Sequence, residues 1–165
     1  MKKIVGIMGP REESATKDDL KNAYEIGKFC AAKGYVVLTG GVKSGVMDAG
    51  LKGAKDGGGL TIGLLPGKDT SAVSDFVDIP ICTGMGAGRN YINAISSDFF
   101  VACGMSPGTS SEISFAIQVG KKIILVGLYK EANDFYKKLA GGKNIFVVKD
   151  YNDACKVIEK EIGLL

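Results

Sequence analysis

Histidine is absent from this sequence of 165 residues. No Ser–His or Cys–His nucleophilic pair can therefore form, and any acid–base chemistry falls to carboxylates, lysine, tyrosine or the substrate itself. The cysteines are far apart in the sequence and contain no C-x-x-C motif, which disfavours a zinc site. We expect no bound metal and interpret the cysteines as buried, reduced thiols: Cys30, Cys82, Cys103 and Cys155.

A strong excess of one charge and long apolar runs are also missing. The net charge is only +3 and the lysines are scattered among acidic residues, so a nucleic-acid partner is not indicated. No apolar segment approaches the roughly 20 residues of a membrane-spanning helix. The N-terminal Met1-Lys2-Lys3 leads into a predicted strand instead of a signal peptide. We therefore expect a cytoplasmic protein with no membrane partner, in which residues 1–165 form a single domain.

Buried, β-rich runs alternate along the chain with segments of helical periodicity. The unbroken run from Tyr35 to Thr39 is typical of a parallel strand covered on both faces. The alternation predicts an α/β fold: a doubly wound, mostly parallel, Rossmann-like sheet of about seven strands in three layers. We predict strands over residues 3–8, 35–39, 60–65, 76–81, 98–103, 122–127 and 144–148, and helices that begin near residues 16, 44, 89, 109, 133 and 151.

Glycine-rich turns follow the first, second, fourth and fifth predicted strands. In a parallel sheet these turns meet at one edge, where ligands collect and where glycine lets the backbone approach a phosphate. Ser44 is also a plausible N-cap for a helix through Ala54, and a loop arginine such as Arg11 is more often solvated than ligand-bound. The candidate ligand-binding residues of the first, second and fourth turns are Gly9, Arg11, Gly40, Gly41, Ser44, Gly84 and Gly86.

The stretch from Ile79 to Gly120 carries two ionisable groups, each predicted in the first turn of a helix at the same sheet edge. Arg89 is repelled by the positive end of its own helix, and an anionic ligand would remove that conflict. The alternative is that Arg89 is solvated or paired with an acidic side chain. Glu112 fits a capping box with Thr109 as N-cap, a structural role that needs no ligand.

Small residues before Glu112 favour a ligand over a simple helix cap. A helix cap does not require three small residues such as Gly104, Ser106 and Gly108 before it, whereas a close approach of the backbone to a phosphate does. The candidate phosphate-binding residues of this turn are Ser106, Gly108 and Thr109.

These motifs resemble two related families. Arg89 followed by Gly108-Thr109-Ser110-Ser111-Glu112 is similar to the lonely-guy signature, although Gly104, Met105 and Ser106 replace its opening Pro-Gly-Gly. The molybdenum cofactor carrier proteins and their relatives, some labelled lysine decarboxylase, are more similar over residues 3–127. The matching segments are Gly40-Gly41, Ser44 to Met47, Ile62 to Gly67, Arg89-Asn90 and Ser97-Asp98.

The resemblance implies two functions. As in the lonely-guy phosphoribohydrolases, Arg89 and Glu112 would act as catalytic residues in hydrolysing a nucleoside 5′-monophosphate to free base and ribose 5-phosphate. As in the carriers, the same groups, with Asn90 and the glycine turns, would hold the molybdenum cofactor or another pterin phosphate without turnover. In either case the partner is a small phosphorylated molecule, no resident cofactor is required, and the resemblance implies a homodimer or higher homo-oligomer.

The polar segment from Lys68 to Ser74 follows the third predicted strand. We interpret it as a mobile, solvent-exposed flap at the mouth of the site, because such loops often carry function.

Overall fold

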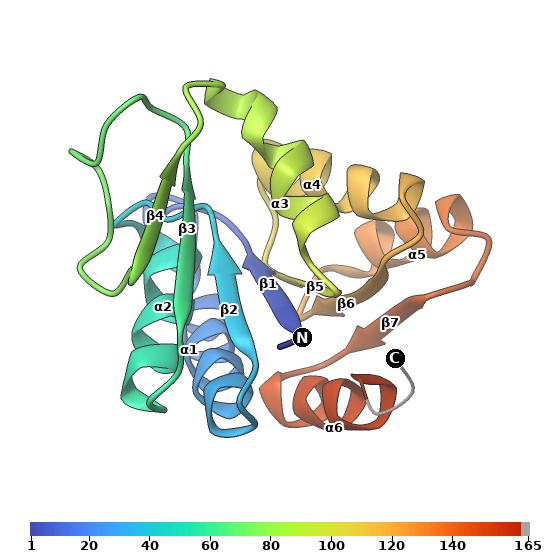
Figure 1. Ribbon diagram of the computed structural model, residues 1–165. Coiled ribbons are helices and arrows are strands. Elements are labelled where there is room, and N and C mark those ends of the chain that lie inside the picture. The colour runs from blue at the N-terminus through green and yellow to red at the C-terminus, as the bar shows by residue number, and fades with distance from the viewer. Residues whose placement is uncertain (163–165) are drawn as a thin grey trace.

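The computed structural model describes residues 1–162 and contains a seven-stranded sheet with the order β4-β3-β2-β1-β5-β6-β7 (Figure 1). Every neighbouring pair is parallel, so the predicted mostly parallel sheet is entirely parallel among these strands. The α/β prediction is confirmed. The strands are β1 (Ile4–Met8), β2 (Val36–Thr39), β3 (Thr61–Leu65), β4 (Ile79–Cys82), β5 (Phe99–Cys103), β6 (Lys122–Val126) and β7 (Ile145–Val148).

Helices cover both faces of the sheet and complete the three layers (Figure 1). One apolar core lies between the sheet and α1, α2 and α6, and a second lies under α3, α4 and α5. The alternation of side chains along each strand supplies both cores, because Val5 and Ile7 face the first while Met8 faces the second. The helices are α1 (Lys17–Ala32), α2 (Gly45–Asp56), α3 (Arg89–Ser96), α4 (Pro107–Gln118), α5 (Lys130–Leu139) and α6 (Tyr151–Ile162).

The direction of winding reverses between β1 and β5. The chain adds β2, β3 and β4 on one side of β1, and β5, β6 and β7 on the other. Met8 pairs with Ala102, so the ends of β1 and β5 lie side by side. Ligands of open α/β sheets bind in the crevice beyond the carboxyl ends of the strands at such a switch point. The topology therefore places the predicted turns after β1 and β5 at the edge where a ligand is expected.

The start of α4 differs from the sequence prediction. The helix begins at Pro107 with Ser106 as N-cap, and the Ser106 hydroxyl accepts a hydrogen bond from the Thr109 N–H. Proline is favoured at the first helical position because its missing N–H would have no helical partner there. The predicted capping box of Thr109 and Glu112 is wrong, and Glu112 lies in the second turn, where its carboxylate is free for another role.

The first two helices pack closely through glycine. A Cβ added to Gly53 of α2 would lie 1.9 Å from the Tyr24 carbonyl oxygen of α1, and one added to Gly27 would lie 2.2 Å from the Gly50 oxygen. Residues without side chains are therefore required where these backbones meet. The start of α2 also holds the loop between β1 and α1, because the Val46 N–H donates to the Pro10 carbonyl at 3.1 Å. This loop forms one wall of the pocket described below.

The segment after β3 is not the free flap that we predicted. Val73 forms an antiparallel bridge with Val42, and the Ser74 N–H donates to the Gly41 carbonyl. Ser74 is buried, whereas Lys68 is exposed as expected. Backbone hydrogen bonds to the turn after β2, which the sequence pattern does not reveal, hold the end of this segment.

The thiols differ in burial. Cys30 and Cys103 are buried as expected, and burial raises the pKa of both thiols. Cys155 is half-buried and Cys82 is exposed on the edge strand β4, so the prediction of buried thiols is wrong for Cys82. Within the described residues, histidine, cysteine and carboxylate side chains form no group of three or more that could hold a metal ion. None of the helices in this part of the chain is long and apolar enough to cross a membrane.

Candidate functional site

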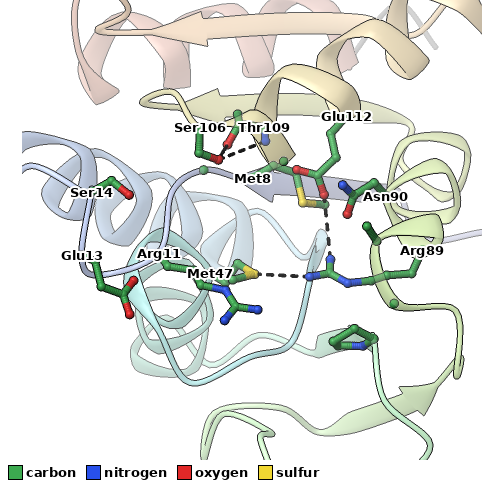
Figure 2. Close-up of a pocket in the computed structure, with 15 residues that line it drawn as sticks. Met8, Arg11, Glu13, Ser14, Met47, Arg89, Asn90, Ser106, Thr109 and Glu112 are labelled. Carbon is green, nitrogen blue, oxygen red and sulfur yellow. Dashed lines mark hydrogen bonds and ion pairs between the residues drawn. The ribbon is translucent and has the colours of Figure 1, made fainter.

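A pocket of about 490 Å³ opens at the switch point (Figure 2). Its walls come from the loop after β1, the start of α2, the turn before α3 and the first turns of α4. This volume is in the range of small-molecule sites. Nine of the predicted site residues line it: Gly9, Arg11, Gly86, Arg89, Asn90, Ser106, Gly108, Thr109 and Glu112.

Arg89 is the buried cation of this pocket. It is the first residue of α3, as predicted, and only 7% of its surface is exposed. Its Nη2 contacts the Met47 sulfur at 3.9 Å, but within residues 1–162 its Nε and Nη1 have no hydrogen-bond partner. Burial lowers the pKa of the guanidinium, Glu112 opposes that effect and Arg11 adds to it. A buried charge with unused donors is energetically costly, and an anion in the pocket would offset that cost.

Glu112 approaches Arg89 without satisfying it. Its Oε1 lies 3.8 Å from Arg89 Nη1, an ion pair beyond hydrogen-bonding distance (Figure 2). The same oxygen accepts a hydrogen bond of 2.7 Å from Asn93 Nδ2. Burial raises the pKa of Glu112 to about 7, against smaller opposing effects of the Asn93 hydrogen bond and the Arg89 charge. Near neutral pH both the charged and the neutral form of the carboxyl group are therefore populated.

The N-terminus of α4 offers fewer free donors than the sequence suggested. Pro107 has no N–H, and the Thr109 N–H is used by the Ser106 hydroxyl. The Ser106 and Thr109 hydroxyls also bond each other at 2.9 Å. Gly108 lies at the second helical position, where its N–H has no helical partner. The helix dipole still favours an anion here, but the main unused donors belong to Arg89.

Arg11 extends the positive potential to the mouth of the pocket. Figure 2 shows Arg11 and Arg89 reaching into the pocket from opposite sides. Arg11 is exposed, so solvent and salt screen its charge far more than that of buried Arg89. Glu13 lies on the same loop and also lines the mouth. An anionic ligand would therefore meet an exposed cation first and a buried one at the end of its path.

Four predicted ligand residues do not line the pocket. A Cβ on Gly40 would lie 2.2 Å from Arg89 Nη1, so this glycine makes room for the guanidinium. Gly41, with φ of 70°, packs against Gly63. Ser44 is at the N-cap position of α2, but its hydroxyl accepts from the Glu12 N–H. Gly84 lies beside the Lys68 side chain.

Sequence reasoning missed several residues of the site. Met8 and Met47 place thioethers in the pocket wall, and Pro66 lines it after β3. Asn93 lies behind Glu112 and is fully buried. The signal for Asn93 is its spacing of four residues from Arg89, which puts both on one helix face. Met47 and Pro66 belong to segments that carried the family resemblance, but apolar side chains gave no chemical reason to select them.

Comparison with known proteins gives the family. The model of the SLOG cluster4 family matches residues 2–155. The chain belongs to the SLOG cluster4 family. An uncharacterized protein from Archaeoglobus fulgidus is 41% identical over 119 residues, which is 72% of this chain and 76% of that protein.

Two solved structures are similar over almost the whole chain. A molybdenum cofactor binding protein from the phototrophic bacterium Rippkaea orientalis is 42% identical, with a TM-score of 0.93 over 98% of both chains. The molybdenum cofactor carrier protein of Chlamydomonas reinhardtii is 44% identical, with a TM-score of 0.93 over 99% of both chains. These findings confirm the predicted fold and the resemblance to the carrier proteins.

Proposed function

We propose that this protein binds a phosphorylated pterin of the molybdenum cofactor type as cargo and carries it without chemical change. The observation that carries the proposal is the buried Arg89, whose Nε and Nη1 have no partner within residues 1–162. Both donors belong to one planar guanidinium, a group whose N–H donors suit a phosphate or another oxyanion. The molybdenum cofactor carrier and binding proteins that are 42–44% identical support the choice of ligand class.

The pocket fits such a ligand on its own evidence. Its volume of about 490 Å³ accommodates a bicyclic ring system with a phosphate. Cationic and polar groups line the cavity together with the apolar side chains of Met8, Met47 and Pro66. Thioethers adapt their shape to flat, polarizable ring systems. Arg89 would hold the anionic group, and the methionines would contact the ring.

The experiment is a binding and turnover assay with a pterin monophosphate. We expect the probe, at one hundred times its Kd, to stabilise the folded protein by about 2.7 kcal/mol and to be recovered unchanged. Thermal unfolding and chromatography of the recovered ligand measure the two results. A pterin without phosphate serves as the control and is expected to shift the unfolding temperature much less. Absence of a shift at millimolar pterin monophosphate would contradict the proposal.

Phosphoribohydrolase activity is the second candidate, and one observation favours it. Glu112 is a pocket carboxyl group whose pKa of about 7 suits general acid–base catalysis. The same assay with AMP and other nucleoside monophosphates distinguishes the candidates, because hydrolysis releases free base and ribose 5-phosphate. If the parent protein released free base and Glu112→Gln did not, phosphoribohydrolase activity would replace the carrier proposal, because a carrier returns its ligand intact.

Gly40→Ala tests whether the position of Arg89 controls affinity. The added Cβ would overlap the guanidinium, with distances of 2.2 to 2.6 Å to Nη1, Nη2 and Cζ. We expect about a tenfold weaker affinity for pterin monophosphate, equivalent to about 1.4 kcal/mol, and a change in unfolding free energy below about 1 kcal/mol. Isothermal titration calorimetry and urea denaturation measure these values. Gly67→Ala is the matched control, because its Cβ would meet only Asp69 backbone atoms at 3.9 Å.

We also propose self-association, as the family resemblance implied. Large apolar side chains are exposed on α3, on the edge strand β4, and on α5 together with the residue before it. Exposed apolar surface of this kind is characteristic of protein interfaces. A second copy of the chain is the partner that we expect. The cytoplasmic location of the protein is a separate expectation and remains a prediction from the sequence. The exposed apolar side chains on these three elements and at the start of α5 are Ile79, Ile81, Tyr91, Ile95, Tyr129, Phe135 and Leu139.

A further inference from the structure

Asn93 carries a fully buried side-chain amide that has no role in the ligand binding proposed above. It lies on α3, four residues after Arg89, and none of its surface is exposed. Its Nδ2 donates to Glu112 Oε1 at 2.7 Å, but its Oδ1 is buried and has no hydrogen-bond partner within residues 1–162. An unpaired acceptor in a dry interior is unfavourable, so this oxygen requires a donor that the ionised carboxylate of Glu112 cannot provide.

A proton on Glu112 would supply that donor. A neutral carboxylic acid has an O–H group, whereas a carboxylate only accepts hydrogen bonds. With the N–H···O bond from Asn93 already in place, the acid O–H could bond Asn93 Oδ1 and complete a cyclic acid–amide pair. Both members of the pair would then have their hydrogen bonds satisfied. The buried amide is therefore suited to a neutral Glu112 as well as to a charged one.

An anion bound to Arg89 would change the charge balance around Glu112. The charged or titratable groups that face the pocket are Arg89 from α3, and Arg11 and Glu13 from the exposed loop after β1. The sides formed by β1 and α2 contribute the uncharged Met8 and Met47. Arg89 is the nearby counter-charge, with Nη1 at 3.8 Å from Glu112 Oε1. A ligand oxyanion that takes the free donors of Arg89 places a second negative charge beside this buried carboxylate.

We propose that Glu112 and Asn93 form a proton-holding pair, so that the site takes up one proton from solvent when a phosphate-bearing anion binds Arg89. The proton goes to the Glu112 carboxyl group, no covalent bond other than this O–H is formed, and Asn93 acts as a positioning residue. This inference rests on the proposed ligand class, because a neutral ligand would give no reason for proton uptake. It adds a pH dependence that the carrier function by itself does not require.

The expected pH dependence follows from the free protein. Burial raises the pKa of Glu112 to about 7, so at pH 8 the ligand-free group is mostly ionised. Binding with uptake of a proton becomes weaker as pH rises, by close to tenfold per pH unit between about pH 7.5 and 8.5. Below about pH 6.5 the group is already mostly protonated, and its contribution to the pH dependence disappears. A phosphate monoester, with a second pKa of about 6, is fully ionised in the higher range and adds no slope there.

Calorimetric titration of the intact protein with pterin monophosphate at pH 8 tests the proposal. Titrations in two phosphate-free buffers of different ionisation enthalpy give the number of protons taken up. We expect close to one proton for the parent protein. In Glu112→Gln the side-chain amide imitates the protonated acid, because it can donate to Asn93 Oδ1 and accept from Asn93 Nδ2. We expect this variant to take up none, to lose the pH slope, and to bind about tenfold more tightly than the parent at pH 8.

Asn93→Leu tests the positioning role. Its leucine removes the amide, so the carboxylate loses one hydrogen bond whereas the neutral acid loses both bonds of the cyclic pair. We therefore expect uptake at pH 8 to fall well below one proton, a change that a merely structural asparagine would not produce. Binding of pterin monophosphate without proton uptake, and with no pH slope in the parent protein, would overturn this inference alone. No binding at any pH would overturn the proposed function, and this inference with it.

Discussion

Arg89→Met is expected to lower the affinity for pterin monophosphate by about 100-fold while leaving the unfolding free energy unchanged or higher. Hydrogen bonds to charged groups contribute about 1.5–3 kcal/mol each, and a loss of about 2.7 kcal/mol is 100-fold in Kd. Arg89 Nε and Nη1 are the buried donors without partners that would make these bonds. We therefore expect most of the binding energy to come from one side chain and not from the helix N-terminus that the sequence emphasised.

The stability expectation has a separate cause. Without ligand the buried guanidinium has lost its water and regained only a 3.8 Å ion pair with Glu112 and a contact with Met47. Replacing a poorly compensated buried charge with an apolar residue is often neutral or stabilising. The Met47 sulfur and the Met8 side chain provide an apolar surface against which the new methionine can pack. Functional sites commonly sacrifice stability in this way.

Calorimetry and guanidinium denaturation measure the two effects of Arg89→Met. Arg11→Met is the matched control, because it removes the exposed arginine on the opposite side of the pocket. We expect the control to weaken binding only a few-fold and mainly at low salt, since solvent screens its charge. Parent-like affinity in Arg89→Met would contradict the proposed site. A loss of stability above about 2 kcal/mol would show that Arg89 is needed for the fold itself.

Gly53→Ala is expected to lower the unfolding free energy by about 3 kcal/mol, the upper part of the range for overpacking. The added methyl would lie 1.9 Å from the Tyr24 oxygen, 2.7 Å from its carbonyl carbon and 3.0 Å from its Cα. All three are backbone atoms of α1, so the helices must separate. Alanine has a higher helix propensity than glycine by about 1 kcal/mol, which opposes the loss but does not remove it.

Gly108→Ala is the control for this stability effect. It is the same substitution in a helix, but the new methyl would meet Ser106 Oγ at 3.8 Å and Asn90 Nδ2 at 3.9 Å, which are ordinary contacts. We expect its unfolding free energy to equal or slightly exceed that of the parent in urea denaturation. Equal stability of Gly53→Ala and the parent would mean that α1 and α2 can move apart freely, contrary to the close packing seen here.

The fold could be predicted because its signals are local. Unbroken apolar runs such as the one from Tyr35 to Thr39 indicate buried parallel strands, and glycine-rich turns follow β1, β2, β4 and β5. Helix boundaries were less accurate where two signals compete. At α4, both Ser106 and Thr109 are good N-caps, and the proline between them decides in favour of the earlier start.

The candidate site was predictable in its location and its charged residues, but not in its bonding. The sequence itself determined that polar and glycine-rich turns follow β1 and β5, and that an arginine and a glutamate lie on the two helices beside them. Only the tertiary structure decided that Arg89 is buried with unused donors and that Gly40 makes room for it. The structure also decided that Asn93 bonds Glu112. These features depend on contacts between segments distant in sequence or on the direction of side chains, and a residue pattern specifies neither. Desolvation sets the chemistry of the Arg89 and Glu112 pair, and these side chains are desolvated only once the layers of the fold have closed around them.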